Sequence, residues 1–217
     1  MCGITGLINL DDSPVSPVTL QKMTDAIAHR GPDGEGHWIE GNVGLGHRRL
    51  AIIDLTPAGH QPMSSADHRY VLSCNGEIYN FRELRADLEA EGYWFRSKTD
   101  SEVVLYALAQ WGADVLLKFN GMFALAFWDR KEKTLFLARD RYGIKPLYYS
   151  QQSNTFAFGS EQKAILARPE FKRKLNKPAL LEYFTFQNIF TDQTLLEDIH
   201  LLPAGHHATL NLNNLKS

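Results

Sequence analysis

The amino-acid sequence predicts an α+β fold, in which helices cover antiparallel β-sheets. Segments with strand character follow one another as hairpins, and segments with helical character also follow one another in pairs. This grouping is typical of antiparallel sheets with helices packed outside them. The 217 residues contain no internal repeat, no low-complexity segment and no linker rich in Pro, Gly or Ser. We therefore expect one domain over residues 1–217.

The first elements follow from apolar runs and helix signals. Gly3 to Leu10 predicts a strand that begins next to Cys2. Ser16 and Pro17 then predict a helix start, because an N-cap residue is followed by proline at the first helical position. We expect this helix to end by Gly31. The residues that share its apolar face are Leu20, Met23 and Ile27.

Two extended segments come next. Val43 to Asp54 predicts a strand, in which Gly44 and Gly46 indicate a bulge or a close approach of another backbone. Tyr70 to Cys74 predicts a short apolar strand that ends at the dipeptide Asn75-Gly76.

Capping boxes predict the next two helices. Asn80 to Glu83 has the pattern of one, and Leu84 and Leu88 follow it on one helical face before Gly92. Thr99 to Glu102 repeats the pattern. The apolar residues expected in that second helix are Val104, Leu108 and Trp111.

The rest of the chain is expected to contain two hairpins, two short helices and a last strand. The hairpins are Met122 to Trp128 with Thr134 to Ala138, and Pro146 to Tyr149 with Thr155 to Phe158. The helices are Glu161 to Leu166 and Pro178 to Phe184, and the last strand is His207 to Leu212.

Composition argues against several classes of function. The chain has 23 basic and 25 acidic residues and no basic stripe with interleaved aromatic side chains, so we expect no nucleic-acid partner. Its two cysteines, Cys2 and Cys74, do not form a disulfide framework. No apolar run approaches the ~20 residues of a membrane span, and no signal peptide is visible. We therefore expect a cytoplasmic protein with no membrane contact.

Cys2 is the candidate nucleophile. If Met1 is removed, Cys2 carries both a thiol and a free α-amine. The amine can accept the thiol proton directly or through one water, which generates the reactive thiolate. The transfer costs little, because the two groups titrate near ~8 and ~8.5. Position alone leaves a second interpretation open, in which Cys2 is a small residue near the start of the chain.

Three other places carry candidate chemistry, and each also has a structural explanation. Asn75 and Gly76 form either a plain turn or a pair of donors for a developing oxyanion, the carboxamide and a backbone N–H. Arg49 is either a surface residue or a clamp for a substrate carboxylate. Asp100 either stabilises a helix start or faces a substrate ammonium group.

Linked motifs strengthen the functional interpretation. They are Met1-Cys2-Gly3-Ile4, His29-Arg30-Gly31-Pro32-Asp33-Gly34, His47-Arg48-Arg49-Leu50, Asn75 to Asn80, Thr99-Asp100, Asp140 to Leu147 and Gly159-Ser160-Glu161. In this order they resemble the glutaminase domain of class II glutamine amidotransferases. The amino-acid sequences of these motifs most closely resemble those of the glutamine-dependent asparagine synthetases. The resemblance covers nearly the whole chain.

This resemblance implies an N-terminal nucleophile hydrolase fold, a four-layer α/β/β/α sandwich of two antiparallel sheets. It implies that Cys2 attacks the carboxamide of glutamine with its own amine as base, and that Asn75 and Gly76 form the oxyanion hole. The substrate-binding residues it implies are Arg49, Leu50, Glu77 and Asp100. A thioester forms, releases ammonia and is hydrolysed to glutamate. The resemblance implies no metal and no cofactor for this reaction.

Asparagine synthetases also contain an ATP-using domain, and this sequence shows none of its motifs. No pyrophosphate loop and no Gly-x-x-x-x-Gly-Lys loop is present. We therefore expect ATP and Mg²⁺ to act only in a synthetase domain or subunit that lies outside this chain. Two alternatives stay open, a free-standing or related amidotransferase serving another ammonia acceptor and a non-catalytic regulatory member of the fold. A homodimer and the removal of Met1 are also left open.

Two further features are expected to be structural. Cys74 alternates away from Asn75 along a strand and is expected to be a buried core thiol. His206 and His207 are adjacent on the last strand, so their side chains point to opposite faces, and we expect no metal site there.

Overall fold

Two antiparallel sheets form the centre of the protein. The computed structural model describes residues 1–216. One sheet has the strand order β10-β8-β9-β1-β3-β2, and the other has the order β11-β7-β6-β5-β4. The strands of the first sheet are β1 (Gly3–Asn9), β2 (Gly34–Glu40), β3 (Val43–Arg49), β8 (Tyr148–Gln152), β9 (Thr155–Gly159) and β10 (His200–Leu201). Those of the second are β4 (Met63–Ser64), β5 (Tyr70–Ile78), β6 (Gly121–Asp129), β7 (Thr134–Arg139) and β11 (His207–Asn211).

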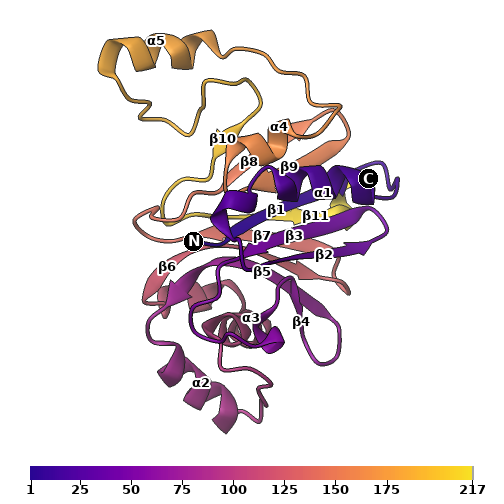
Figure 1. Ribbon diagram of the computed structural model, residues 1–217, viewed down its shortest axis with the longest axis vertical. Helices are drawn as coiled ribbons and strands as arrows, with labels where there is room; N and C mark the ends of the chain where they lie inside the picture. The colour runs from indigo at the N-terminus through magenta and orange to yellow at the C-terminus, as the bar shows by residue number, and fades with distance from the viewer. Residues whose placement is uncertain (217) are drawn as a thin grey trace.

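Helices cover the outer face of each sheet. α1 (Pro17–Asp25) and α4 (Gln162–Leu166) pack on the first sheet, and α2 (Phe81–Ala90) and α3 (Asp100–Trp111) lie on the second (Figure 1). Short 3₁₀ turns occupy Ala28–Arg30, Pro57–Gly59, Gly112–Leu117 and Leu212–Lys216. The predicted four-layer α/β/β/α arrangement is therefore confirmed. None of the helices in the described part of the chain is long and apolar enough to cross a membrane.

Each pair of neighbouring layers has its own apolar core. The central cluster lies between the two sheets. It contains Ile4, Leu45 and Phe158 of the first sheet and Ala124, Ala126 and Trp128 of the second. A second cluster joins β5 to α2 and α3, and a third joins the first sheet to α1 and α4. Because β1 lies in the middle of its sheet between β9 and β3, its start at Gly3 is fixed from both sides.

The structure corrects two strand boundaries. β3 ends at Arg49 and not at Asp54, because residues 50–59 leave the sheet and form an irregular loop with a 3₁₀ turn. β5 continues to Ile78, so Asn75-Gly76 is not a turn. Both residues are paired in the ladder with β6, opposite Ala124 and Phe123. Pairing with a neighbouring strand overrides the local turn preference of Asn-Gly.

Two strands and one helix cap also differ from the expectations drawn from the sequence. β2 and β4 were not expected, since β2 is a largely polar edge strand and β4 is only two residues long. The Asn80 side chain does not cap α2; it donates to the Lys118 carbonyl (3.0 Å) and accepts from the Asn120 N–H (3.0 Å). Thr99 does cap α3, accepting from the Glu102 N–H at 3.2 Å.

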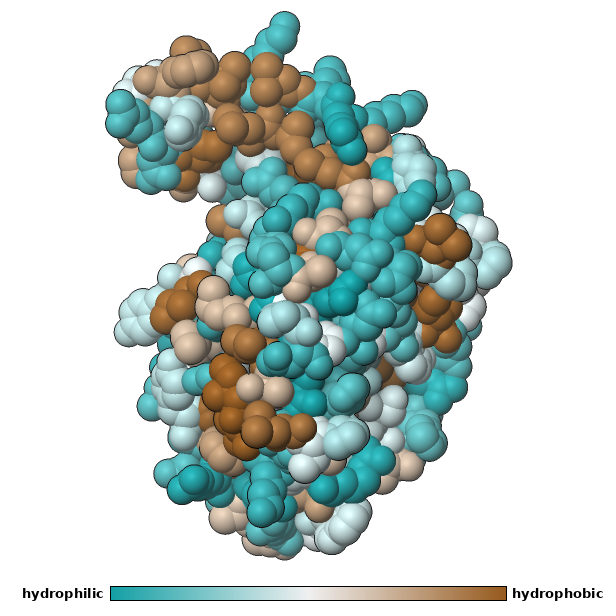
Figure 2. Space-filling view, viewed as in Figure 1, coloured by the Kyte–Doolittle hydropathy of each residue, from teal (hydrophilic) through white to brown (hydrophobic). Residues whose placement is uncertain are grey.

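One helix stands apart from the four layers. α5 (Lys177–Phe186) lies on a long excursion of the chain that projects from the sandwich (Figure 1). Its side chains and the following segment give the apolar surface at the top of Figure 2. We call Leu181, Phe184, Phe186 and Phe190 the α5 surface; each of the four is at least 61% exposed.

Candidate active site

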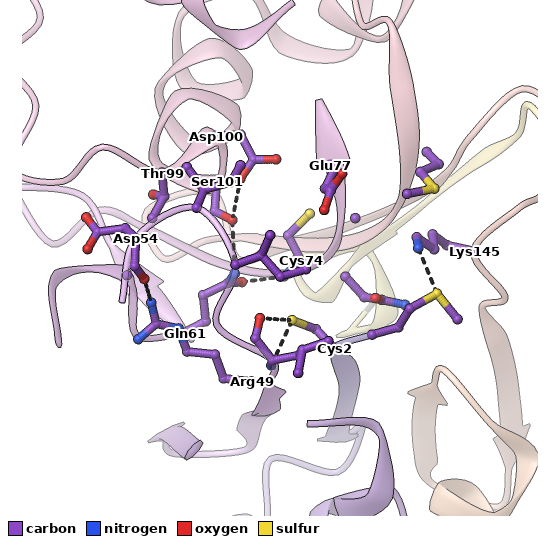
Figure 3. Close-up of a pocket in the computed structure, with 18 of the residues that line it drawn as sticks. Cys2, Arg49, Asp54, Gln61, Cys74, Glu77, Thr99, Asp100, Ser101 and Lys145 are labelled. Carbon is purple, nitrogen blue, oxygen red and sulfur yellow. Dashed lines mark hydrogen bonds between the residues drawn. The ribbon is translucent and has the colours of Figure 1, made fainter. Parts of the chain in front are cut away.

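A cavity of about 270 Å³ lies beside Cys2, Arg49 and Asn75, where β1 begins and β3 ends (Figure 3). All seven site residues expected from the sequence line it. They are Cys2, Arg49, Leu50, Asn75, Gly76, Glu77 and Asp100. They come from both sheets and from the start of α3. The stacked sheets therefore bring together side chains that are far apart along the chain.

The Cys2 thiol is held by the backbone of Leu50. The Leu50 N–H donates to Cys2 Sγ at 3.3 Å, and Sγ lies 3.6 Å from the Leu50 carbonyl oxygen (Figure 3). Burial raises the pKa of this thiol above its ordinary value, while the Leu50 N–H and the positive charge of Arg49 oppose that rise. The thiol therefore needs a base to become a nucleophile at neutral pH.

The start of β1 is anchored by two of the linked motifs. Arg30 Nε donates to the Cys2 carbonyl oxygen at 2.9 Å, and Arg30 Nη1 pairs with Glu161 at 2.9 Å. Ser160 Oγ accepts from the Ile4 N–H at 3.0 Å. Burial alone would raise the pKa of Glu161, but hydrogen bonds from Arg30, Lys163 and His29 lower it to about 2. Glu161 is thus a charged anchor for the segment that presents Cys2.

The motif that contains Arg30 requires a glycine at position 31, because the chain passes close to the β3 backbone there. A Cβ atom there would lie 2.3 Å from the Arg48 carbonyl carbon, so only glycine lets the turn pass this close to β3.

Arg49 is a buried cation held by carbonyl oxygens. Nη1 donates to the Thr56 carbonyl at 3.0 Å, and Nη2 donates to the Asp54 carbonyl. No carboxylate of the described residues lies within ion-pair distance of the guanidinium. Two of its five N–H groups are occupied by these carbonyls, so others are available to an anion in the cavity.

Asn75 offers an unpaired donor. Its side chain is 1% exposed, and its buried Nδ2 has no hydrogen-bond partner among the described residues. An orphaned buried amide is costly unless something fills the site.

Gly76 offers a second donor through its backbone. It lies opposite Phe123, whose N–H and C=O both bond to Asp140 on the far side of β6. Gly76 is therefore in a non-hydrogen-bonded pair, and its N–H points away from β6. On that same edge of β5, the Cys74 N–H donates to Gln61 Oε1 at 2.6 Å and the Ile78 N–H donates to Asp100 Oδ2 at 2.9 Å. The Gly76 N–H lies between these two.

Asp100 and Glu77 give the cavity negative charge. Asp100 is the first residue of α3, where its carboxylate is favoured by the helix dipole, and it is 6% exposed. Burial nevertheless raises its pKa, and the nearby Glu77 carboxylate adds to the rise. A cation in the cavity would relieve both effects.

A comparison with known protein families identifies the family of this chain. A family model described as "Glutamine amidotransferase domain" matches residues 1–217. The chain belongs to this glutamine amidotransferase family.

Two curated relatives of this chain within the glutamine amidotransferase family are asparagine synthetases. Asparagine synthetase [glutamine-hydrolyzing] 3 of Bacillus subtilis (strain 168) is 42% identical over 187 residues, which is 85% of this chain and 30% of the relative. Asparagine synthetase [glutamine-hydrolyzing] 1 of the same strain is 37% identical over 213 residues, 97% of this chain and 33% of the relative. The chain thus spans about a third of the length of these curated relatives.

A solved structure supports the fold. The glutamine phosphoribosylpyrophosphate (PRPP) amidotransferase from B. subtilis, complexed with ADP and GMP, superimposes with a TM-score of 0.67. It is 17% identical, and the match covers 97% of this chain and 49% of that one. At this identity the likeness concerns the fold alone. The N-terminal nucleophile hydrolase fold expected from the motifs is confirmed.

The cavity also contains residues that the sequence analysis did not predict. Gln61, Met122, Ile144 and Lys145 line the cavity. Gln61 stands in no recognisable motif and reaches β5 only through tertiary contact. Lys145 lies in the Asp140 to Leu147 motif. That motif contributes to the family resemblance, but the sequence alone predicted no function for Lys145.

Cys74 has the structural setting expected of it, whereas His206 lies before β11, which begins at His207. Cys74 is buried among core residues, although it also lines the cavity wall, and burial raises its pKa well above the ordinary value. Among the described residues, no group of three or more His, Cys, Asp or Glu side chains could hold a metal ion.

Proposed function

We propose that this chain hydrolyses L-glutamine to L-glutamate and ammonia through a thioester on Cys2. One observation carries the proposal. The cavity places the Cys2 thiol among two unpaired N–H donors, a buried cation and a buried carboxylate. These four features match the reacting carbon, the carbonyl oxygen, the α-carboxylate and the α-ammonium group of an amino-acid amide.

Substrate recognition follows from charge. Arg49 binds the α-carboxylate through N–H groups that the Asp54 and Thr56 carbonyls leave free, and Leu50 contributes to the same wall. Asp100, assisted by Glu77, binds the α-ammonium group. Bound glutamine thus neutralises Arg49 and Asp100 together.

The chemistry uses the freed terminus of Cys2. After removal of Met1, the α-amine accepts the thiol proton and Sγ attacks the carboxamide carbon. Negative charge moves to the carbonyl oxygen, which the Asn75 Nδ2–H and the Gly76 N–H stabilise. The amine then returns the proton to the departing nitrogen, and the C–N bond breaks to release ammonia. Water hydrolyses the thioester and regenerates the thiol, giving glutamate. No metal or cofactor takes part in these steps, and we expect a reducing compartment, the cytoplasm, to keep Cys2 competent.

The ammonia acceptor is proposed from the relatives. Asparagine-forming relatives are about three times as long as the region that they share with this chain. We propose that an asparagine-forming synthetase part, which uses ATP and Mg²⁺, receives the ammonia. We place its contact on the α5 surface, where four large apolar side chains are exposed on a projecting helix and the segment that follows it (Figure 2). An exposed apolar surface of this kind is typical of a contact with another protein part, and the relatives contain additional sequence that could form such a part.

A parallel assay tests the proposal. The 217-residue chain is incubated with glutamine, and glutamate is measured; aspartate, ATP and Mg²⁺ are then added, and asparagine is measured on the same preparation. We expect glutamate and ammonia but no asparagine. Absence of glutamate from folded, Met1-free chain would refute the proposed hydrolysis. Formation of asparagine would show a nucleotide site that the proposal does not contain.

A further inference from the structure

Lys145 is a buried cation in the cavity wall. Its side chain is 3% exposed, and its Nζ lies 2.9 Å from Met1 Sδ (Figure 3). No carboxylate of the described residues lies within ion-pair distance of this ammonium group. A buried charge without a counter-ion is expensive, so its retention in a cavity wall calls for a functional explanation.

The backbone around Lys145 is fixed rigidly. The Asp140 carboxylate, which is fully buried, accepts from the N–H groups of Ile144 (2.9 Å) and Lys145 (2.9 Å). The Lys145 carbonyl accepts from Arg139 Nε at 2.8 Å. The ammonium group is therefore aimed at Met1 by a loop that has little freedom. Met1 is joined to Cys2 through the nitrogen that becomes the amine, and both Cys2 and Lys145 line the cavity from which Met1 is removed.

Other charges near Cys2 are balanced, or become balanced when substrate binds. Arg30 is paired with Glu161, which also holds His29 and Lys163. Arg49 is neutralised by the substrate carboxylate and Asp100 by the substrate ammonium group, while Glu77 stays a second carboxylate in the cavity wall. The remaining titratable groups near the site include Cys74, whose thiol is buried, and His47, whose pKa burial lowers to about 4. They also include the carboxylates of Asp54, in the cavity wall, and of Asp140, which accepts from the Lys145 N–H. Among the described residues, Lys145 is then a cation of the cavity wall that no carboxylate meets at ion-pair distance.

We propose that Lys145 is a positioning residue whose cation keeps the Cys2 amine unprotonated and favours the Cys2 thiolate. The proposal rests on the proposed function, because it concerns the amine that acts as base there. A nearby cation makes a second ammonium group unfavourable, and it stabilises an anion on sulfur. Both effects increase the fraction of Cys2 that is ready to react at neutral pH. Burial raises the pKa of the Cys2 thiol, so a cation that favours the thiolate would act against that rise.

The test compares two pH profiles in Met1-free protein. The first is the rate at which iodoacetamide alkylates Cys2, followed on the N-terminal peptide by mass spectrometry. The second is kcat/KM for glutamine hydrolysis. The variants are Lys145→Met and Lys145→Gln, which remove the charge, and Lys145→Arg, which keeps it. Lys131→Met is the matched control, since Lys131 is exposed in the turn between β6 and β7.

The neutral variants should move the midpoint of alkylation and the acidic limb of kcat/KM to higher pH, each by on the order of one unit. Lys145→Arg should restore both profiles, and Lys131→Met should leave them unchanged. If the neutral variants fold and their profiles overlay those of the parent, the proposal is overturned. If Lys145→Met and Lys145→Gln both fail to fold, the proposal is also overturned, because Lys145 then serves the stability of the fold. The alkylation profile needs no glutamine turnover, so it tests Lys145 even if the proposed hydrolysis is wrong.

Discussion

The backbone N–H of Leu50 lies 3.3 Å from the sulfur of Cys2. This contact joins the residue after β3 to the residue before β1. Arg49 precedes Leu50 in the sequence, so it lies in the same cavity wall as the candidate nucleophile. Because β1 and β3 are neighbours in register, with Gly3 opposite Arg48, the spacing between thiol and guanidinium is set by the sheet. The candidate nucleophile and the proposed carboxylate clamp thus lie at the ends of two paired strands of one sheet.

Asn75→Ala should lower kcat by roughly 10²–10³-fold, because its Nδ2–H is needed most when charge develops on the substrate oxygen. Ser73→Ala is the matched control, since Ser73 lies on the same strand and its Oγ donates to the Gly46 carbonyl at 3.2 Å. Steady-state kinetics on both variants decide the point. An Asn75→Ala enzyme with parental kcat would remove Asn75 from the oxyanion hole.

Arg49→Ala should mainly raise KM, by roughly 10- to 100-fold, because hydrogen bonds to charged groups contribute about 1.5–3 kcal/mol and the α-carboxylate is bound alike in ground and transition states. Arg48→Ala is the control, since the Arg48 guanidinium pairs with Glu35 at 2.7 Å and does not line the cavity. A kcat defect with unchanged KM in Arg49→Ala would contradict this role.

His47 should make stability depend on pH. It is fully buried, its Nε2 lies 3.1 Å from the Cys74 carbonyl oxygen, and burial lowers its pKa from 6.5 to about 4. As the pH falls below about 6.5, the unfolded chain takes up the proton and the folded chain does not, so stability falls until about pH 4.

Between pH 7 and pH 5 this loss should be about 2 kcal/mol. Urea unfolding at both pH values measures it. His47→Gln should unfold with a smaller pH dependence than the parent, whereas exposed His207→Gln should match the parent. Equal pH dependence in the parent and His47→Gln would show that His47 is not held neutral by the fold.

Phe184→Glu with Phe190→Glu should leave glutamine hydrolysis within about twofold of the parent, because both side chains are exposed and neither lines the cavity. In the assembly with an asparagine-forming part, the same pair should lower the asparagine formed per glutamate released. Trp94→Glu, another exposed aromatic position, should not. Unchanged coupling would refute the α5 surface as the contact. A change only in the self-association of the chain would assign the surface to a second copy.

Local sequence signals predicted the helices and most strands, because those signals act over a few residues. Pro17 begins α1 after the Ser16 cap, and Thr99 caps α3 as expected. The four-layer arrangement and the site residues came from the order of motifs, since apolar patterns alone do not indicate which strands pair. β2 was missed because a polar edge strand lacks an apolar pattern.

Features set by distant contacts could not be predicted from the sequence. The free N–H of Gly76 depends on its register with Phe123, and the Asn75-Gly76 turn was the wrong local interpretation. Gln61 reaches the Cys74 N–H, and Lys145 reaches Met1 across 144 positions of sequence. In each case the local sequence carries no sign of the partner.

Glutamine hydrolysis by Cys2→Ala tests the central claim most directly. The parent, the variant and Cys74→Ala, the matched control for the other cysteine in the cavity wall, are purified without Met1 and checked by intact mass and thermal unfolding. Cys2→Ala should fold and release no glutamate above the uncatalysed background, while Cys74→Ala keeps activity. Glutamate release by Cys2→Ala at the parental rate would contradict the thioester mechanism.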